Sequence, residues 1–146
     1  MKKFSLFFII MVVFFIGCEK KVDFTAKEVH WDRDMCERCK MVLSDRKFSA
    51  QVINPKNGRT YFFDDIGCAI LWFQEEKIAW ANEAIIWVND AKNGAWIDAR
   101  KASFSTKNIT PMAYGFGAHA RREDIVENQE IIDFEAMRKR IIEIGK

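Results

Sequence analysis

The chain has 146 residues, of which 49% are hydrophobic and 14% aromatic, and its formal net charge is +2. This length and composition are typical of one compact domain with a packed core. Residues 1–17 contain two lysines and no acidic residue, so +2 minus these two charges leaves zero for the rest of the chain. The sequence therefore does not indicate a basic nucleic-acid-binding surface, and we expect no nucleic acid among the partners.

The N-terminus has the pattern of an export signal. Two lysines precede an apolar run at 4–16, which is shorter than the roughly 20 residues that span a membrane. Residues 15–18 resemble a bacterial lipobox, although Phe15 stands where Leu is usual. We expect cleavage before Cys18 and lipidation of Cys18; an ordinary signal peptide or an uncleaved anchor is the alternative. The predicted location is the periplasmic side of a bacterial membrane, with the outer membrane favoured over the inner one.

The central part of the chain predicts two β-hairpins and a helix. Alternating and aromatic-rich segments indicate strands, and an Asn-Gly pair between two of them indicates a hairpin turn. The expected elements are a strand at 48–54, a turn at Asn57-Gly58, a strand at 60–63, a helix at 66–76 capped by Asp64 and Asp65, a strand at 84–89, a turn at Asn93-Gly94 and a strand at 95–99. The triplet Lys-Asn-Gly recurs 36 positions apart, so we interpret the region as a duplicated β-hairpin unit within one domain; chance recurrence is the alternative.

The C-terminal third is more irregular. A long loop at 102–120 has one expected strand within 112–119, and a short helix or turn follows at 121–128. The closing segment at 133–146 has the period of an amphipathic helix with Asp133 as its cap. Phe134, Met137 and Ile141 share one face of that helix, so we expect all three in the core.

Three cysteines remain beyond residue 18, and they leave more than one chemistry open. Cys36 and Cys39 form a C-x-x-C pair, and Cys68 stands alone. A closed zinc site would need Cys36, Cys39, Cys68 and His119, but no second ligand pair is present. A thioredoxin-like pair should open a helix after a strand, whereas this motif precedes the first strand. Because free Cys is among the most buried residues, Cys68 is favoured as a core residue over a ligand.

Copper(I) fits the neighbouring methionines better than zinc does. It prefers thiolate and thioether donors, and Met41 follows Cys39 after one residue. On an extended backbone this spacing places two sulfur atoms on the same side. A second loop methionine, Met112, lies within "TPMAYGFG". Met41 is equally compatible with a strand residue that packs inward.

At these residues the chain resembles the NosL family, copper-binding lipoproteins that serve the assembly of nitrous oxide reductase, the copper enzyme of denitrification. The resemblance rests on four segments that occur in this order between about 35 and 125: "MCERCKMVLSDRKFSAQV", "TYFFDDIGCAILWF", "AWIDARKASF" and "TPMAYGFGAHA". It implies an α+β fold, a single domain of two related ββαβ units shared with organomercury lyases. It also implies a signal peptide at 1–17, a lipid-anchored polar tether at 18–33 and a metal-binding domain at 34–146.

What the resemblance implies for function is a Cu(I) metallochaperone and not an enzyme. It would deliver copper to apo nitrous oxide reductase through a membrane ABC-type maturation complex, anchored in the lipid membrane by acylated Cys18. The metal ligands that it implies are Cys39, Met41, Met112 and Cys36, with His119 and Cys68 less certain. The resemblance also implies glycine at position 40, where this chain has Lys40.

Two other classes stay open from the sequence. One is a thiol–disulfide oxidoreductase that uses Cys36 and Cys39, and the other is a structural zinc-binding lipoprotein. No Ser-His-Asp or paired-carboxylate arrangement is supported, since Asp64 and Asp65 are adjacent and helix capping explains them. Another soft metal or another copper enzyme as client is also compatible with the sequence.

Overall fold

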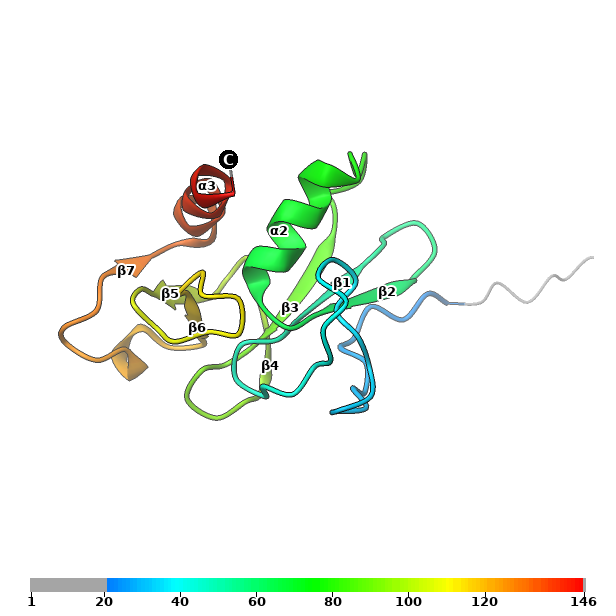
Figure 1. Cartoon of the computed structure of the whole chain (residues 1–146). Coiled ribbons are helices and arrows are strands. Elements are labelled where there is room, and N and C mark those ends of the chain that lie inside the picture. The colour runs from blue at the N-terminus through cyan, green and yellow to red at the C-terminus, as the bar shows by residue number, and fades with distance from the viewer. Residues whose placement is uncertain (1–20, 146) are drawn as a thin grey trace, which may run out of the picture.

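The computed structural model describes residues 21–145. Its elements are, in chain order, β1 (Ala50–Ile53), β2 (Thr60–Phe63), α2 (Ile66–Glu75), β3 (Ile85–Asn89), β4 (Trp96–Asp98), β5 (Ser103–Ser105), β6 (Gly117–His119), the 3₁₀ helix η1 (Arg122–Asp124), β7 (Ile131–Ile132) and α3 (Phe134–Ile144). All neighbouring strands of both sheets pair antiparallel and the two α-helices pack against the sheets, so the predicted α+β class is confirmed (Figure 1). No described helix has the length and apolar character needed to cross a bilayer.

The first sheet contains both predicted hairpins side by side. Its strand order is β2-β1-β3-β4, with every neighbouring pair antiparallel. Gly58 and Gly94 have φ of 72° and 77°, a left-handed region that Gly adopts without steric cost, which explains the two Asn-Gly turns. The repeated triplet therefore marks two hairpins of one sheet, as the interpretation of a duplicated hairpin unit predicted.

The two faces of this sheet are covered by different segments. Helix α2 packs on the face that carries Val52 and Val88 (Figure 1). On the opposite face Gln51 is fully buried; its side chain accepts the Lys27 N–H and donates to the Lys27 carbonyl, each at 2.8 Å. The Trp87 indole N–H also donates to the carbonyl of residue 24 at 2.9 Å. Residues 24–29 thus lie against the sheet, while the predicted division of the chain at residue 33 stays a prediction.

The second sheet is smaller, with the order β6-β5-β7. In it β5 lies between its hairpin partner β6 and the later strand β7, just as β1 lies between β2 and β3 in the first sheet. The order ββαβ is complete in β1-β2-α2-β3, whereas α3 follows β7 in the second half. Strands β5 and β7 were not predicted, and β6 is the C-terminal part of the strand predicted within 112–119.

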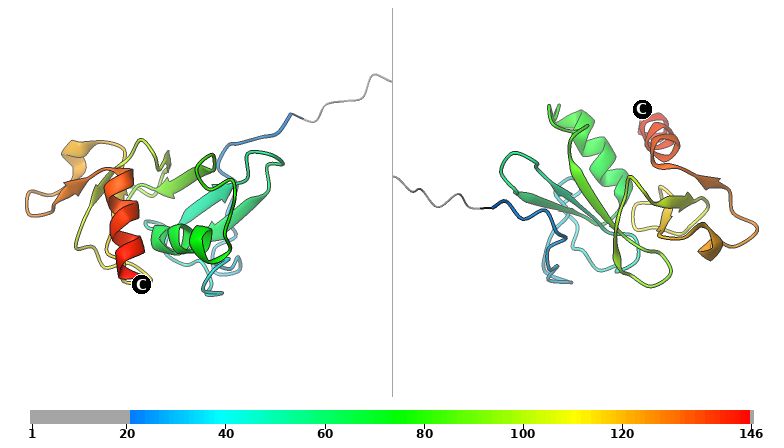
Figure 2. Two further views of the ribbon diagram at one scale, coloured as in Figure 1. Left: turned by 90° about the horizontal axis from the view of Figure 1, so that it is seen from above. Right: turned by 180° about the vertical axis from the view of Figure 1, so that it is seen from behind.

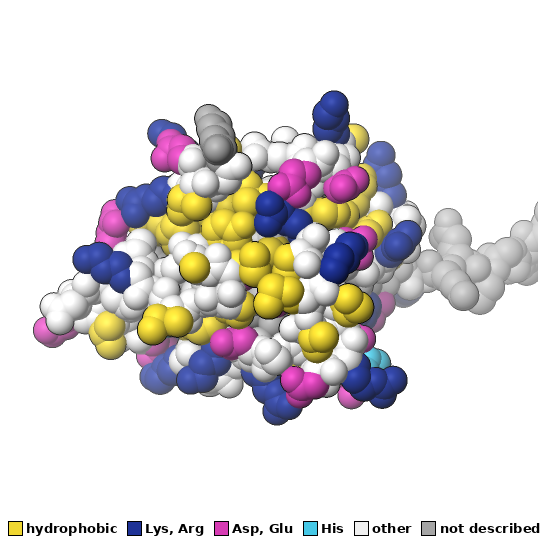
Figure 3. Space-filling model, viewed as in Figure 1, with side chains coloured by type: hydrophobic (Ala, Val, Ile, Leu, Met, Phe, Trp, Pro, Cys, Tyr) yellow, Lys and Arg dark blue, Asp and Glu magenta, His cyan; other side chains and the backbone are white. Residues whose placement is uncertain are grey.

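The two helices lie side by side and enclose much of the core between them and the sheets, as two views show (Figure 2). Residues 66–73 of α2 are all buried, so this part of the helix is covered on every side. Helix α3 buries Phe134, Met137 and Ile141, as predicted. Hydrophobic side chains gather on the surface between the two helices in the face seen in Figure 3.

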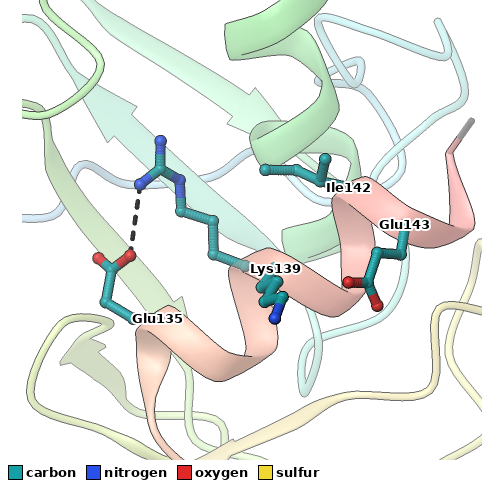
Figure 4. A pocket seen from close by; sticks show the side chains of 5 residues that line it. Glu135, Lys139, Ile142 and Glu143 are labelled. Atoms are coloured by element: carbon teal, nitrogen blue, oxygen red, sulfur yellow. Dashed lines mark hydrogen bonds and ion pairs between the residues drawn. The ribbon is translucent and has the colours of Figure 1, made fainter.

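One side of α3, which includes Ile142 next to α2, carries a depression of about 340 Å³. Two acidic and two basic side chains and Ile142 line it, and the Arg138 guanidinium donates to Glu135 at 3.3 Å (Figure 4). Charged side chains of both signs on one exposed helix face are typical of a solvated surface. Its lining contains no thiol or imidazole, so the candidate metal site lies elsewhere.

Candidate metal centre

The C-x-x-C motif forms the tip of a short hairpin at 34–43. The Cys36 N–H donates to the Met41 carbonyl at 2.8 Å, and Met35 pairs with Val42 in an antiparallel bridge. The N–H of residue 37 donates to a carbonyl of β2 at 2.8 Å, which attaches this hairpin to the edge of the first sheet. The cysteine pair is therefore held against the strand that leads into α2.

The backbone between Cys39 and Met41 is not extended. Lys40 has a φ of 60°, in the left-handed region that glycine favours. The prediction that an extended Cys39-Lys40-Met41 step places both sulfur atoms on one side is therefore wrong in its geometry, because the chain turns at Lys40. The left-handed backbone gives a physical reason to expect glycine at this position.

The end of β2 and the start of α2 supply the other half of the site. Asp65 is the helix N-cap, with an extended backbone, and its side chain accepts the Gly67 N–H at 2.9 Å. Asp64, in contrast, does not cap the helix, so the prediction that both aspartates do is wrong for Asp64. It belongs instead to a group with the thiols, and Cys68 joins it from the first turn of α2.

Cys36, Cys39, Cys68 and Asp64 form the thiol–carboxylate group. One ligand atom of each lies within 4.8 Å of the others. The Cys39 thiol donates to Asp64 Oδ1 at 3.5 Å, and the Cys39 N–H donates to Cys36 Sγ at 3.5 Å. Cys36, Cys68 and Asp64 are buried, whereas Cys39 is partly exposed. The group is therefore reached from solvent past Cys39.

The three thiols differ in acidity because they share hydrogen bonds. A hydrogen bond from Cys68, together with backbone N–H groups, lowers the pKa of Cys36 to about 6. Burial is the main cause that raises the pKa of Cys39 to about 11. The hydrogen bond to Cys36, followed by burial, raises the pKa of Cys68 far above its ordinary value. The shared hydrogen bonds thus favour ionisation of Cys36 before the other two thiols, and a metal ion that binds all three sulfurs displaces the protons that remain on them.

Hydrogen bonds and ring contacts link the C-x-x-C turn and the start of α2 to the loop at 110–116. Arg38, between the two cysteines, makes a bidentate ion pair with Glu75 of α2 at 2.9 and 2.7 Å and donates to the Tyr114 hydroxyl at 3.1 Å. The Tyr114 ring lies so close to Gly67 that a Cβ there would be 2.1 Å from it. Asp65 accepts the backbone N–H of Met112 at 3.3 Å, which holds the loop at the start of α2.

The predicted ligands are only partly brought together. The three cysteines meet, and Cys68 is buried as predicted for a core residue while its thiol faces the group. Met41 is 51% exposed beside the group, and Met112 is partly buried in the adjoining loop, so their roles stay predictions. His119 lies in β6 outside the group and pairs with Ser105 at 2.9 Å. Cys18 lies outside the described residues.

Asp64 is the member of the group that sequence reasoning missed. Its adjacency to Asp65 did contain a signal, because successive side chains at the end of a strand point to opposite sides and only one can cap the helix. Three soft sulfur donors suit Cu(I), and sulfur with one carboxylate oxygen also suits Zn(II). The four residues are thus compatible with binding a metal ion.

The fold and this group define a small α+β domain with a cysteine-rich group that is compatible with metal binding. No protein-family model matches the chain, and no curated protein sequence does either. The chain is similar in fold to the crystal structure of the copper chaperone NosL from Shewanella denitrificans, with a TM-score of 0.59. The likeness covers 81% of this chain and 93% of that one at 13% sequence identity. The predicted resemblance to NosL is therefore confirmed at the level of the fold, and this neighbour is a chaperone, not an enzyme.

Proposed function

We propose that the chain is a lipid-anchored Cu(I) metallochaperone. The observation that carries this proposal is the convergence of three cysteine thiols from two distant segments, on a fold similar to that of a copper chaperone. Thiolates are the donors that Cu(I) prefers, and a cluster of three satisfies its low coordination number. An ordinary structural core has no need for three free thiols within contact of one another.

The placement of the thiols also suits transfer. Cys36 and Cys68 are buried, whereas Cys39 and Met41 lie toward solvent. An acceptor protein approaching this side meets Cys39 first and replaces the ligands one at a time. We infer that Met41 supplies a thioether for the entering or leaving ion, because a flexible, exposed thioether next to a thiol is a soft donor that binds without holding the ion tightly.

The proposed location and partners rest on the leader and on the NosL resemblance. The Gly17-Cys18 junction supports lipidation and a position on the periplasmic side of a bacterial membrane, with the outer membrane favoured. The proposed client is apo nitrous oxide reductase, reached through a membrane ABC-type complex. Mixing the copper-loaded chain with the apo reductase and measuring copper in the separated proteins tests this client; copper that stays on the chain argues for another client.

The acidity of the thiols argues against a thioredoxin-like oxidoreductase. Such an enzyme needs an accessible thiol with a lowered pKa as its nucleophile. Here the accessible thiol, Cys39, has its pKa raised by burial, and the thiol with the lowered pKa, Cys36, is fully buried. Reduction of insulin by the purified chain would reverse this conclusion.

The central test is competition with a Cu(I) chelator under reducing conditions. The full-length chain should bind one Cu(I), and Cys39→Ser should lower its affinity by about a hundredfold. Met41→Ala should lower it by about tenfold. Met35→Ala is the matched control, since Met35 lies on the same hairpin and is 53% exposed against 51% for Met41. The proposal fails if the chain takes up no Cu(I), or if Cys36 and Cys39 form a stable disulfide in the cell that prevents uptake.

A further inference from the structure

Residues 22–29, which we call the strap, lie against the first sheet. The fully buried Gln51 side chain accepts the Lys27 N–H and donates to the Lys27 carbonyl, each at 2.8 Å. The Trp87 indole N–H donates to the Phe24 carbonyl at 2.9 Å. These bonds make the strap part of the folded domain, so we expect any flexible part of the proposed anchor to end where the strap begins.

The strap begins at the turn between β1 and β2. A Cβ on Gly58 of that turn would lie 2.6 Å from Cγ1 of Val22. This end of the first sheet lies on the opposite side of the molecule from β7 and the loop between η1 and β7 (Figures 1 and 2). Only three residues separate Cys18 from Val22, and four Cα steps extend at most about 14 Å. A lipid on Cys18 would therefore hold the β1–β2 turn close to the bilayer.

The surface at this end combines apolar and basic side chains. We call it the anchor end, and it consists of Val22, Phe24 and the turn at 54–59. Val22 and Phe24 are large apolar residues that are 39% and 37% exposed. Residues 19–28 and 54–59 contain five basic and three acidic residues, a net charge of +2, whereas the chain beyond residue 17 has a net charge of zero. Positive charge is therefore concentrated near the anchor end.

Most of the unpaired charge there is positive. Asp23 forms an ion pair with Lys27 within the strap, which leaves Glu28 as the other acidic residue of the strap. Lys56 and Arg59 are exposed on the turn, and neither forms an ion pair within residues 21–145. Lysine and arginine side chains next to a membrane are attracted by anionic headgroups, and exposed apolar side chains enter the boundary between headgroups and acyl chains.

We propose that the anchor end binds the headgroups of an anionic bilayer and fixes the orientation of the domain on it. This inference rests on the proposed lipid anchor at Cys18 and deepens it. A short anchor gives the anchor end a high effective concentration at the bilayer, so a weak contact is sufficient.

The orientation also sets the distance of the thiols from the membrane. The C-x-x-C hairpin is hydrogen-bonded to the carbonyl of Phe62, three residues beyond Arg59 in the chain. The rise of a β-strand places this bond roughly 10 Å from the turn. The thiol–carboxylate group therefore stays within reach of a partner protein that is embedded in the same bilayer.

The test uses the full-length chain, purified with its lipid and reconstituted in phosphatidylcholine vesicles with and without phosphatidylglycerol. Phe24→p-benzoylphenylalanine places a photo-crosslinker at the anchor end. Val126→p-benzoylphenylalanine is the matched control, because Val126 is an apolar residue that is 64% exposed and lies between η1 and β7. In anionic vesicles the yield of lipid adduct should be at least about tenfold higher at position 24 than at 126. Lys56→Glu combined with Arg59→Glu should lower the yield at position 24 by at least about threefold.

The outcomes separate this inference from the proposed anchor. Mass spectrometry of the lipid on Cys18 and flotation with vesicles report the anchor, and neither readout involves copper. If the chain is lipidated but the two positions give equal yields, the inference is wrong and the anchor stands. If the chain carries no lipid but position 24 still forms adducts with anionic vesicles, the anchor is wrong and the anchor end remains a membrane contact. If it carries no lipid and forms no adducts, both are wrong.

A second measurement needs no crosslinker, in case those variants do not fold. Nuclear magnetic resonance of the unmodified lipidated chain, in nanodiscs that contain a gadolinium-chelating lipid, should show the strongest signal loss at 22–28 and 54–59 and the weakest at 117–132. Uniform signal loss would mean that the domain turns freely on its anchor and would overturn the inference. Gln51→Leu removes both hydrogen bonds to Lys27 and should make the loss more uniform; an unchanged profile would show that the strap does not set the orientation.

Discussion

Two buried polar clusters lie in this molecule, and they differ in how far their members satisfy one another. In the second sheet, His119 pairs with Ser105 at 2.9 Å, and Asn108 donates to the same hydroxyl at 2.9 Å. At the start of α2, by contrast, Asp64 faces the thiols without a strong donor. The first cluster combines donors with acceptors and holds a sheet together. The second gathers groups that ionise to negative charge, an arrangement that suits a cation.

Each cluster also has a glycine where a neighbouring side chain approaches closely. A Cβ at Gly67 would lie 2.1 Å from the Tyr114 ring. A Cβ at Gly117 would lie 3.0 Å from the Asn108 amide nitrogen and 3.1 Å from the Ser105 hydroxyl. A ring packed over a helix cannot move aside as readily as the end of an amide side chain, so the two positions should tolerate a methyl group unequally.

The largest effect in this comparison is expected for Gly67→Ala. The added Cβ must displace the Tyr114 ring, which packs against Gly67 beside the thiols. We therefore expect a loss of about 1–3 kcal/mol in the free energy of unfolding. The affinity for Cu(I) should fall as well, because Tyr114 is hydrogen-bonded to Arg38 of the C-x-x-C turn. Urea denaturation and chelator competition measure the two quantities.

Gly117→Ala is the control for that substitution. It should cost less stability than Gly67→Ala and leave the Cu(I) affinity unchanged, since His119 and its neighbours are outside the thiol–carboxylate group. Equal losses of stability for the two variants, or a Cu(I) affinity that responds to Gly117→Ala, would remove the distinction between the two clusters.

The second-largest expected effect is a pH dependence of the free energy of unfolding that comes from His119. Burial lowers the pKa of His119 below its ordinary value of 6.5, although Asp90 and Asp124 oppose the shift. Its Nδ1 is buried and has no hydrogen-bond partner in the described structure, which also favours the neutral ring. The unfolded chain therefore takes up a proton at higher pH than the folded chain. Stability from this residue is complete above pH 6.5 and falls as the pH drops through that value toward the lower folded-state pKa.

Urea denaturation at a series of pH values checks this expectation. Between pH 7 and the acid side of 6.5, the unmodified chain should lose more stability than His119→Gln, whose side chain does not titrate. The Cu(I) affinity should change equally with pH in both proteins, because His119 is outside the thiol–carboxylate group. A pH dependence of stability that is the same in both proteins would show that His119 contributes none.

The two clusters also show how far the sequence predicts this fold. The strand at 60–63, both Asn-Gly turns and the capping aspartates of α2 and α3 follow from local rules, because each depends on a few adjacent residues. Strands β5 and β7 have three residues and two, too short for a periodic pattern, and their pairing is decided by tertiary contacts. Their existence was therefore not predictable from local sequence.

The candidate site likewise contains residues that the sequence identifies and residues that only the structure shows. The motif identified Cys36 and Cys39, but the position of Cys68 beside them depends on how β2 and α2 meet. The sequence did not identify Asp64, because helix capping explains either of the two adjacent aspartates. Only the backbone conformation shows that Asp65 is the cap. Long-range convergence of single residues leaves no period or spacing in a sequence, which is why the fourth member of the site appears only in the structure.

The smallest expected effect comes from two lysines with left-handed backbones, one near each cluster. Lys40 has a φ of 60° and Lys107 a φ of 63°. A left-handed backbone costs a non-glycine residue about 1–2 kcal/mol in the folded state. Substitution by glycine removes this cost, but the greater freedom of glycine in the unfolded chain offsets part of the gain. Lys→Gly should therefore stabilise the folded chain by up to about 1 kcal/mol at each site. Lys40→Gly also removes an exposed ion pair with Glu37 at 3.7 Å, which contributes little. Urea denaturation should give similar gains for both variants, whereas only Lys40→Gly, inside the C-x-x-C-x-M turn, should change the rate at which a chelator removes Cu(I). A changed rate in Lys107→Gly would mean that loop rigidity far from the thiols controls release.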